Sequence, residues 1–292
     1  MAREASGQAG QRLGLPPQVE EHAAALCGRS QRLEPLSGLS NATVVRYHGD
    51  RDVLVVKRTN SRESWFYRDI RALLLEHGIR TPECRFNLVA GEEAWLGLES
   101  IAAPFPIAAF PGDASLLHRL ALLHVFPLRS AASHLVIPWT RELNHLVAGL
   151  FGARRDVVEG LLQRYRSILQ CPDCLVWGDA NPHNWAMADD SSPVLLDWQR
   201  WGIGSRAFDL ATFTPGLADR AAARWVAEEY RAACASASLE VPPLELLAGD
   251  ILRAKAWSVV ELLAQPCEPD SALAAEQRAL QPLFGDWLAA CA

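Results

Sequence analysis

The sequence predicts an α+β fold in two lobes, with a β-rich first part and a helix-rich second part. Short apolar runs bounded by tight polar turns dominate up to about residue 100, whereas helical periodicity dominates beyond it. Between them, residues 101–112 carry three prolines and are expected to form a linker or hinge. At 292 residues the chain has the length at which one core begins to divide. We therefore expect an N-terminal lobe over residues 1–102, with 1–14 as a loose terminus, and a C-terminal lobe over 103–292.

The first part alternates strands with helices. The patterns predict a helix over 17–27, an antiparallel hairpin of strands 44–47 and 53–57, a helix over 62–77, and strands over 84–89 and 94–99. Gly78 is a plausible cap at the end of the second helix. This arrangement places most of the β structure before the linker.

Helical patterns fill most of the second part. They cover residues 114–125, 139–150, 155–169, 218–235, 244–264 and 273–291. Two short apolar runs among them, 175–177 and 194–196, are expected to be buried strands, and each leads to an acid, Asp179 or Asp197. A buried carboxylate is unfavourable unless it is paired, so a metal or a proton-transfer role would explain this placement. The alternative is a helix-capping aspartate and an unrelated turn aspartate.

Composition limits the classes of function. Half of the residues are hydrophobic and 21% are charged, which is typical of a soluble globular protein, and no apolar run is long enough to cross a membrane. Residues 1–104 hold 13 basic and 13 acidic side chains, whereas residues 105–292 hold 15 and 21. This distribution argues against a nucleic-acid partner and is compatible with a cationic ligand or with a solvated acidic surface. Seven scattered cysteines and the lack of an apolar leader favour a cytoplasmic protein.

Lys57 is unusual because the chain has 26 arginines and only two lysines. At the end of a buried-looking strand, it suggests that a compact ammonium group is needed there, or else it is an edge-strand lysine that extends to water. Glu63, on the first turn of the next helix, either pairs with Lys57 or complements the helix dipole. The small-residue turn at 36–43 either lays backbone N–H groups over phosphates or is only a turn.

These residues, taken in order from Leu36 to Ala211, resemble the aminoglycoside phosphotransferase and choline kinase-like family, small-molecule kinases that share the protein kinase fold. The motifs that carry the resemblance are G-D-x-x-x-x-N at 178–184, D-W-x-x-x-G with D-L-A at 197–211, R-E-S-W-F-Y-R-D-I at 62–70, and L-A-L-L-H at 120–124. His48-Gly49-Asp50 also spells a family motif, but Val55 stands where Asn is required, so we expect a hairpin turn there.

The resemblance implies a two-lobed protein-kinase-like fold: an N-terminal antiparallel β-sheet lobe with one main helix that covers a nucleotide, and a mostly helical lobe with the catalytic loop and acceptor site. It implies ATP and Mg²⁺ as cofactors and assigns roles to the following residues. On the nucleotide side, Ser37, Gly38, Ser40 and Asn41 would cover the phosphates, and Lys57, held by Glu63, would contact them. Glu99 and Ile101 would flank the adenine-binding hinge. Asn184 and Asp197 would hold Mg²⁺, and Asp179 would orient the acceptor hydroxyl and take its proton.

The chain departs from the family at several positions near the catalytic loop. Trp177 replaces the usual His, Asn181 stands where His is common, His183 where Gly is common, and Gln199 where Glu is frequent. Four tryptophans gather here, at 177, 185, 198 and 201, and either pack beneath the two strands or stack on a ligand.

The predicted function is ATP- and Mg²⁺-dependent transfer of phosphate to a hydroxyl group of a small molecule. The acceptor classes include cationic amines such as aminoglycosides, choline-like compounds and amino alcohols, and also sugars. Glu228, Glu229, Asp250, Glu261 and Trp257 are candidate acceptor-binding residues or simply parts of solvated helix faces. The oligomeric state stays open.

Two other functions compete with this prediction. Trp177 motivates a pseudokinase, a nucleotide- or ligand-binding module with impaired catalysis. A metal hydrolase that uses Asp179, His183 and Asp197 is less favoured, because no second histidine follows at ligand spacing.

Overall fold

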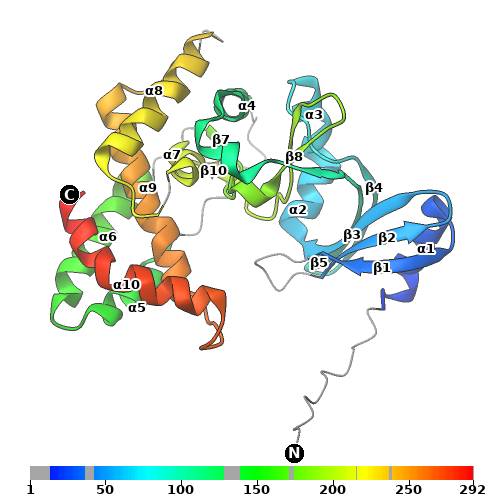
Figure 1. Cartoon of the computed structure of the whole chain (residues 1–292), viewed down its shortest axis with the longest axis horizontal. Helices are drawn as coiled ribbons and strands as arrows, with labels where there is room; N and C mark the ends of the chain where they lie inside the picture. Colours follow the sequence, from blue (N-terminus) through cyan, green and yellow to red (C-terminus); the bar gives the residue numbers. More distant parts are fainter. Residues whose placement is uncertain are drawn as a thin grey trace, which may run out of the picture. The chain divides into compact units, whose positions relative to one another are not determined.

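A computed structural model describes residues 14–36, 43–127, 139–170, 174–214, 216–236 and 239–291. The described chain forms two compact units (Figure 1). One unit contains the described residues up to Asp69 together with Pro82–Ser100, and the other contains Ile70–Thr81 and the residues from Ile101 onward. The first is built around one antiparallel sheet and the second is mostly helical, as the sequence predicts.

The sheet of the first unit has five strands. In spatial order they are β1 (Ser30–Pro35), β2 (Val44–Gly49), β3 (Val53–Asn60), β5 (Glu93–Glu99) and β4 (Cys84–Ala90). The predicted hairpin is formed by β2 and β3, with Val45 opposite Val56, and the Gly49 amide donates to the Asp52 carbonyl at 2.9 Å. The motif His48-Gly49-Asp50 is therefore a hairpin turn, as expected. Strand β1 was not predicted, because its polar sequence lacks an apolar alternation.

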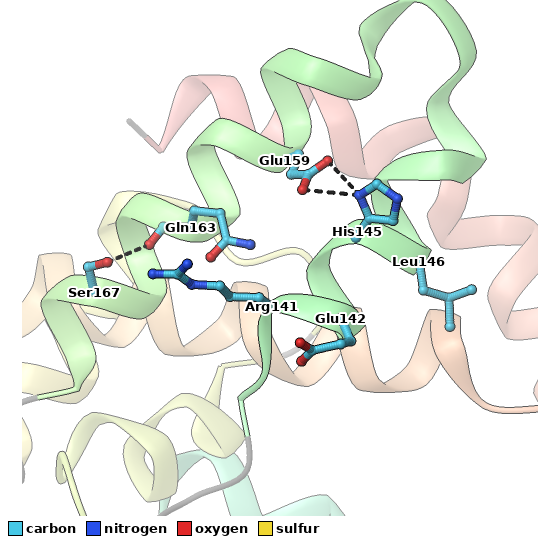
Figure 2. Close-up of a pocket in the computed structure, with 7 residues that line it drawn as sticks. All are labelled: Arg141, Glu142, His145, Leu146, Glu159, Gln163 and Ser167. Carbon is cyan, nitrogen blue, oxygen red and sulfur yellow. Dashed lines mark hydrogen bonds and ion pairs between the residues drawn. The ribbon is translucent and has the colours of Figure 1, made fainter.

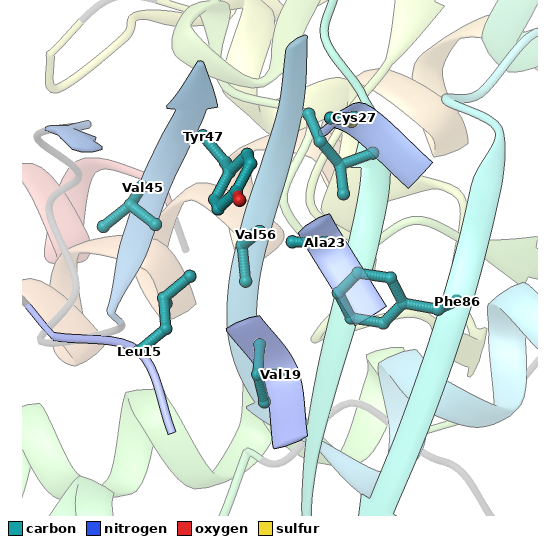
Figure 3. Close-up of a cluster of buried hydrophobic side chains, with 9 residues drawn as sticks. Leu15, Val19, Ala23, Cys27, Val45, Tyr47, Val56 and Phe86 are labelled. Carbon is teal, nitrogen blue, oxygen red and sulfur yellow. The ribbon is translucent and has the colours of Figure 1, made fainter. Parts of the chain in front are cut away.

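The core of the first unit lies between this sheet and helix α1 (Pro17–Cys27) (Figure 3). Its buried members come from the helix, the preceding residue and three strands: Leu15, Val19, Ala23, Cys27, Val45, Tyr47, Leu54, Val56 and Phe86. The Tyr47 hydroxyl donates to the Gly28 carbonyl at 2.9 Å. A Cβ atom at Gly49 would lie 2.0 Å from the Cys27 carbonyl oxygen, so this close approach of helix and hairpin requires glycine.

The helix predicted over 62–77 is present but is not a regular α-helix. It consists of α2 (Ser61–Trp65), a π-helical turn η1 (Phe66–Ile70) and α3 (Arg71–Glu76). Both Phe66 and Tyr67 are buried in the π turn. Gly78 follows with φ +82°, and its amide donates to the Leu75 carbonyl, so the predicted glycine stop is confirmed.

Helices provide most of the second unit. They are α4 (Ala114–His124), α5 (Arg141–Ala148), η3 (Gly149–Arg154), α6 (Arg155–Leu169), α7 (Ala207–Leu210), η5 (Ala211–Phe213), α8 (Arg220–Ser236), α9 (Leu244–Ala264) and α10 (Ala272–Ala290). The helix predicted from residue 139 begins later, because Thr140 is its N-cap and accepts from the Leu143 amide at 3.1 Å. Trp139 instead is buried ahead of the helix, where its indole donates to Asn144.

The expected linker at 101–112 is instead packed structure in the second unit. It contains the short strand β6 (Ala103–Pro104) and the 3₁₀ helix η2 (Ile107–Gly112). Phe105 and Phe110 are buried, and Phe110 stacks on Phe213 with ring centroids 4.5 Å apart. The prolines suggested a loose connection, but these two aromatic side chains hold the segment against the unit.

Two small sheets carry the functional loops of the second unit. One pairs β10 (Gly202–Gly204) with β7 (Cys174–Val176), and the other has the order β6, β8 (Trp185–Met187) and β9 (Pro193–Leu195). Strands β7 and β9 are the predicted buried strands, whereas β8 and β10 were not predicted. Within the described ranges, every helix is too short or too polar to cross a bilayer.

Candidate functional site

The loop between β7 and η4 (Pro182–Asn184) is fixed by its backbone. The amides of Trp177 and Gly178 donate to the two carboxylate oxygens of Asp209, at 2.8 and 2.7 Å. Asp209 lies on α7 and is fully buried. Gly178 has φ +79°, a conformation that favours glycine at this turn. A buried carboxylate therefore holds the peptide that directly precedes Asp179.

Asp209 has a third partner on another helix. The Nε2 atom of His124, in α4, lies 3.1 Å from its Oδ2 atom, and both side chains are buried. The sequence contained both residues in family-like motifs, L-A-L-L-H and D-L-A, but we assigned no role to either. Their joint function is to support the loop.

Asp179 is partly buried and held by its neighbours. The Asn181 side chain donates to its Oδ1 atom at 2.8 Å, and the Asn184 side chain donates to its backbone carbonyl at 2.9 Å. Burial raises the pKa of the Asp179 carboxyl, the Arg200 guanidinium and the Asn181 bond oppose that rise, and the nearby Asp197 adds to it. A fixed carboxylate with a raised pKa is suited to accept a proton.

Asn184 and Asp197 lie at the same end of the β8–β9 hairpin. Asn184 immediately precedes β8, and the Leu196 amide donates to its carbonyl at 2.8 Å. Asp197 has φ +54°, which is unusual for a residue other than glycine. The Trp177 indole N–H donates to the carbonyls of Leu196 and Asp197, at 3.0 and 3.1 Å. This three-centre bond fixes the backbone on which the Asp197 carboxylate is carried.

These side chains suit Mg²⁺ better than zinc. The Asn184 amide nitrogen is used in a hydrogen bond, which leaves its oxygen for a cation, and Asp197 adds a carboxylate. Mg²⁺ prefers such oxygen ligands and completes its shell with water and phosphate. The described residues contain no cluster of three or more His, Cys, Asp and Glu that would hold a metal by themselves. The hydrolase built on Asp179, His183 and Asp197 is therefore not supported.

The tryptophans around the loop belong to the core. Trp177, Trp185, Trp198 and Trp201 are all at most 1% exposed, so the packing alternative is confirmed over ligand stacking. The ring of Trp177 meets that of Trp185 edge to face, with centroids 5.0 Å apart. Its centroid lies 5.6 Å from that of Trp198. Trp177 thus fills space beneath the loop that carries Asp179.

In the first unit, Lys57 and Glu63 form a buried ion pair. Lys57 Nζ lies 3.0 and 2.9 Å from the two carboxylate oxygens of Glu63. Strand β3 lies between β2 and β5, so Lys57 is not on an edge strand, and its side chain is only 6% exposed. The Asn60 side chain accepts from the Glu63 amide at 2.9 Å and caps the helix. Glu63 therefore pairs with the lysine rather than only complementing a helix dipole.

The other residues predicted to bind the nucleotide are those of the adenine-binding hinge and of the phosphate-covering turn. Glu99 ends β5 in the first unit, where its carboxylate accepts from the Glu83 amide at 3.1 Å. Ile101 packs on the small core of β8 and β9 in the second unit. The predicted phosphate-covering residues, which are Ser37, Gly38, Ser40 and Asn41, lie outside the described residues.

Arg200 is a site residue that the sequence reasoning missed. Its guanidinium bonds Glu261, on α9, at 2.6 Å and lies 4.8 Å from the ring centroid of Trp257. Burial raises the pKa of Glu261, an effect that Arg200 opposes and the nearby Asp179 reinforces. Among the acceptor candidates, Glu261 is therefore close to the catalytic loop. In the sequence Glu261 was only one of several acidic residues on the later helices, and Arg200 carried no distinguishing signal.

Other acceptor candidates pair along their own helices. Glu228 bonds Arg224 at 2.9 Å in α8, and both side chains are 48% exposed. Asp250 bonds Arg253 at 2.7 Å in α9. These pairs fit the alternative of charged helix faces.

A separate groove lies between α5 and α6 (Figure 2). It has a volume of about 740 Å³ and is lined by Arg141, Glu142, His145, Leu146, Glu159, Gln163 and Ser167. His145 contacts Glu159 at 3.1 Å across it. None of these described lining residues belongs to the predicted site, so the groove is distinct from the catalytic loop.

Comparisons with known proteins point to one group of enzymes. The model of the phosphotransferase enzyme family matches residues 115–247, which include the catalytic loop. A comparison with curated proteins gives no match. Among solved structures, a spectinomycin phosphotransferase in complex with ADP and spectinomycin has a TM-score of 0.65 at 13% identity, over 96% of this chain and 99% of that one.

Two further structures have the same fold. The choline kinase LicA from Streptococcus pneumoniae has a TM-score of 0.58 at 13% identity, over 94% of this chain and 98% of that one. A putative fructosamine-3-kinase from Haemophilus somnus has a TM-score of 0.53 at 13% identity, over 91% and 96% of the two chains. The predicted resemblance to the aminoglycoside phosphotransferase and choline kinase-like family is thus confirmed, and the chain has the protein-kinase-like fold of these small-molecule kinases.

Proposed function

We propose that this protein is a kinase that transfers phosphate from ATP to a hydroxyl group of a small molecule with the help of Mg²⁺. The observation that carries the proposal is Asp179, a partly buried carboxylate fixed by Asn181 beside the pair Asn184 and Asp197. Phosphoryl transfer asks little covalent chemistry of the protein, and most of the catalysis comes from positioning and from neutralising phosphate charge. The loop has the groups for both tasks.

Each group has one role in this proposal. Asp179 orients the acceptor hydroxyl and takes its proton, a contribution of roughly 10²–10⁴-fold in rate. Asn184 and Asp197 would hold Mg²⁺, which when bound would neutralise part of the phosphate charge. Lys57, kept in place by Glu63, binds the α- and β-phosphates, and the residues from Glu99 to Ala102 bind adenine through their backbone.

The acceptor is proposed to be a cationic hydroxyl compound. Glu261 is a second carboxyl group close to Asp179, and Arg200 binds it at 2.6 Å, so a cationic group of the acceptor could be received beside the proposed catalytic residue. Glu261 would receive the amino group. Spectinomycin and choline, named for two of the similar structures, both combine a hydroxyl group with nitrogen.

The competing pseudokinase function rested on Trp177 in place of histidine. In the structure the Trp177 indole donates to the backbone of Leu196 and Asp197, so the replacement still supports the proposed metal ligand. Asp179, Asn184 and Asp197 are all retained. These observations favour the enzyme.

The test is formation of ADP by the purified protein with a panel of hydroxyl compounds, including amino alcohols and aminoglycosides. Asp179→Asn should lower kcat at least 100-fold with the best acceptor, while thermal stability and ATP binding stay close to wild type. Asp190→Asn, in the exposed turn between β8 and β9, is the matched control and should keep full activity. An active Asp179→Asn protein would refute the catalytic role, and no ADP formation with any compound would refute the function.

A further inference from the structure

A buried tyrosine on α8 contacts the residues that support the catalytic loop. The hydroxyl of Tyr230 lies 2.9 Å from Nδ1 of His124, and both residues are at most 3% exposed. The rings lie 5.6 Å apart at an angle of 55°, so the hydroxyl meets the imidazole edge without stacking. No part of the function proposed above uses this tyrosine.

The partners of these groups define the direction of each hydrogen bond. Asp209 already accepts from two backbone amides and is an acceptor toward His124, so the proton of His124 lies on Nε2. Arg206, which only donates, directs Nη1 to the Tyr230 oxygen at 3.5 Å. Cys234 is also within reach of this hydroxyl, but a thiol is a weak acceptor compared with an imidazole nitrogen. The tyrosine proton therefore points to Nδ1 of His124.

These hydrogen bonds form a continuous chain in which donation runs from Tyr230 to His124 and on to Asp209, whose carboxylate also accepts from the loop that carries Asp179. Tyr230 donates to His124, His124 donates to Asp209, and Asp209 accepts the amides of Trp177 and Gly178. All of its side chains are buried, where hydrogen bonds polarise one another and are not replaced by water. The chain links α8, α4 and α7 to the peptide that precedes Asp179.

We propose that Tyr230 is a positioning residue for phosphoryl transfer. Its hydroxyl fixes the tautomer and ring orientation of His124, so that Asp209 holds the Trp177–Gly178 peptide and thereby the direction of the Asp179 carboxylate. The proposal rests on the kinase function for its effect on rate, but the hydrogen-bond chain is a property of the fold and is tested without substrate.

The first measurement uses the wild-type protein. Nitrogen-15 NMR of the histidine rings, with the His124 signals identified through His124→Gln, should show a proton on Nε2 and an unprotonated, hydrogen-bonded Nδ1. A proton on Nδ1 would overturn the proposal, whether or not Nε2 also carries one. This measurement does not depend on any variant folding well.

The second measurement compares two tyrosine variants. Tyr230→Phe removes only the hydroxyl, and Tyr165→Phe is the matched control, because Tyr165 is also buried but donates to Leu288 on α10. Amide hydrogen exchange should become about fivefold faster at Trp177 and Gly178 in Tyr230→Phe, as expected for one lost buried hydrogen bond, and stay unchanged there in the control. Equal exchange in the two variants would overturn the proposal.

The third measurement is enzymatic. With an acceptor found in the panel, Tyr230→Phe should lower kcat by about fivefold and leave KM for ATP unchanged, whereas Tyr165→Phe should change neither. Faster exchange at Trp177 and Gly178 with an unchanged kcat would overturn the positioning role. If the wild-type protein phosphorylates no compound, the kinase function fails, and the tautomer and exchange measurements still decide whether Tyr230 fixes the loop.

Discussion

Trp177 combines two functions in one side chain, packing and hydrogen bonding. Its ring fills the space against Trp185 and Trp198, and its one N–H group serves two carbonyls, those of Leu196 and Asp197. Asp197 adopts a left-handed backbone conformation, which costs energy for a residue with a Cβ atom. The indole bond offsets part of this cost and keeps the carboxylate of the proposed metal ligand in one direction.

Trp177→Phe tests this role because it keeps an aromatic ring and removes the N–H donor. Two partly buried carbonyls lose the indole donor, so we expect kcat to fall by about tenfold and the Mg²⁺ concentration for half-maximal rate to rise. Trp287→Phe is the control, since Trp287, on α10, donates instead to the Ala218 carbonyl, which lies just before α8. A rate loss of the same size in both variants would show that Trp177 acts only through packing.

The short helical turn α7–η5 supports the loop that carries Asp179 and is itself contacted by helix α9. It carries Asp209, and its Thr212 hydroxyl bonds the Ala180 carbonyl at 3.0 Å, so it supports the catalytic loop twice. Two of its carbonyls receive a partly buried ammonium group, because Lys255 on α9 donates to the C-cap residue Thr214 at 2.6 Å and to Ala211 at 3.4 Å. A cation at the C-terminal end of a helical segment is favourable, although burial opposes its charge.

Lys255 should make the stability of the protein depend on pH in a defined direction. Burial lowers the pKa of Lys255 from its usual 10.5 to about 8, an effect that Glu276 partly opposes. Below pH 8 both folded and unfolded chains hold the proton; between pH 8 and 10.5 the folded chain releases it first, so the free energy of unfolding rises with pH.

Urea unfolding of the wild type and of Lys255→Met at several pH values isolates the contribution of Lys255 to the pH dependence of stability, because the two proteins share all their other titrating groups. The difference in unfolding free energy, wild type minus variant, should increase by up to about 1.4 kcal/mol per pH unit above pH 8. A difference that stays constant with pH would contradict the lowered pKa of Lys255.

At the scale of the whole molecule, the proposed nucleotide-binding groups are divided between two units, each with its own core. The first contains Lys57 and Glu63 on a five-stranded sheet, and the second contains Asn184 and Asp197 at the end of a hairpin. Each group is fixed within its unit by hydrogen bonds or ion pairs. Under the proposed function, binding of ATP with Mg²⁺ should stabilise the folded protein against unfolding.

Thermal unfolding with ATP tests this expectation. At an ATP concentration 100 times the dissociation constant, binding adds about 2.7 kcal/mol, which corresponds to a rise in Tm of roughly 5 °C. Asp197→Asn should lose the part of this rise that depends on Mg²⁺, whereas Asp190→Asn should keep it. A rise that is independent of Mg²⁺ in the wild type would favour the nucleotide-binding module over the kinase.

Much of the fold follows from local sequence patterns. Helices α6 and α9 have the predicted bounds, because apolar residues at helical spacing signal a buried face without knowledge of the partner. The turn at Gly49, the stop at Gly78 and the sequence Gly178-Asp179 follow from local chain chemistry in the same way. The sequence by itself therefore determined most of the helices, the β2–β3 hairpin and the candidate catalytic acids.

Other features were decided only by the tertiary structure. The π turn at Phe66–Ile70 and the strand β1 have no local signal, since they depend on how neighbouring elements bury them. The partners of the catalytic loop are more distant: His124 meets Asp209 across 85 residues and Tyr230 across 106, and Arg200 meets Glu261 across 61. The energy of such pairs comes from burial and from the loss of competing water, which exist only after the chain has folded.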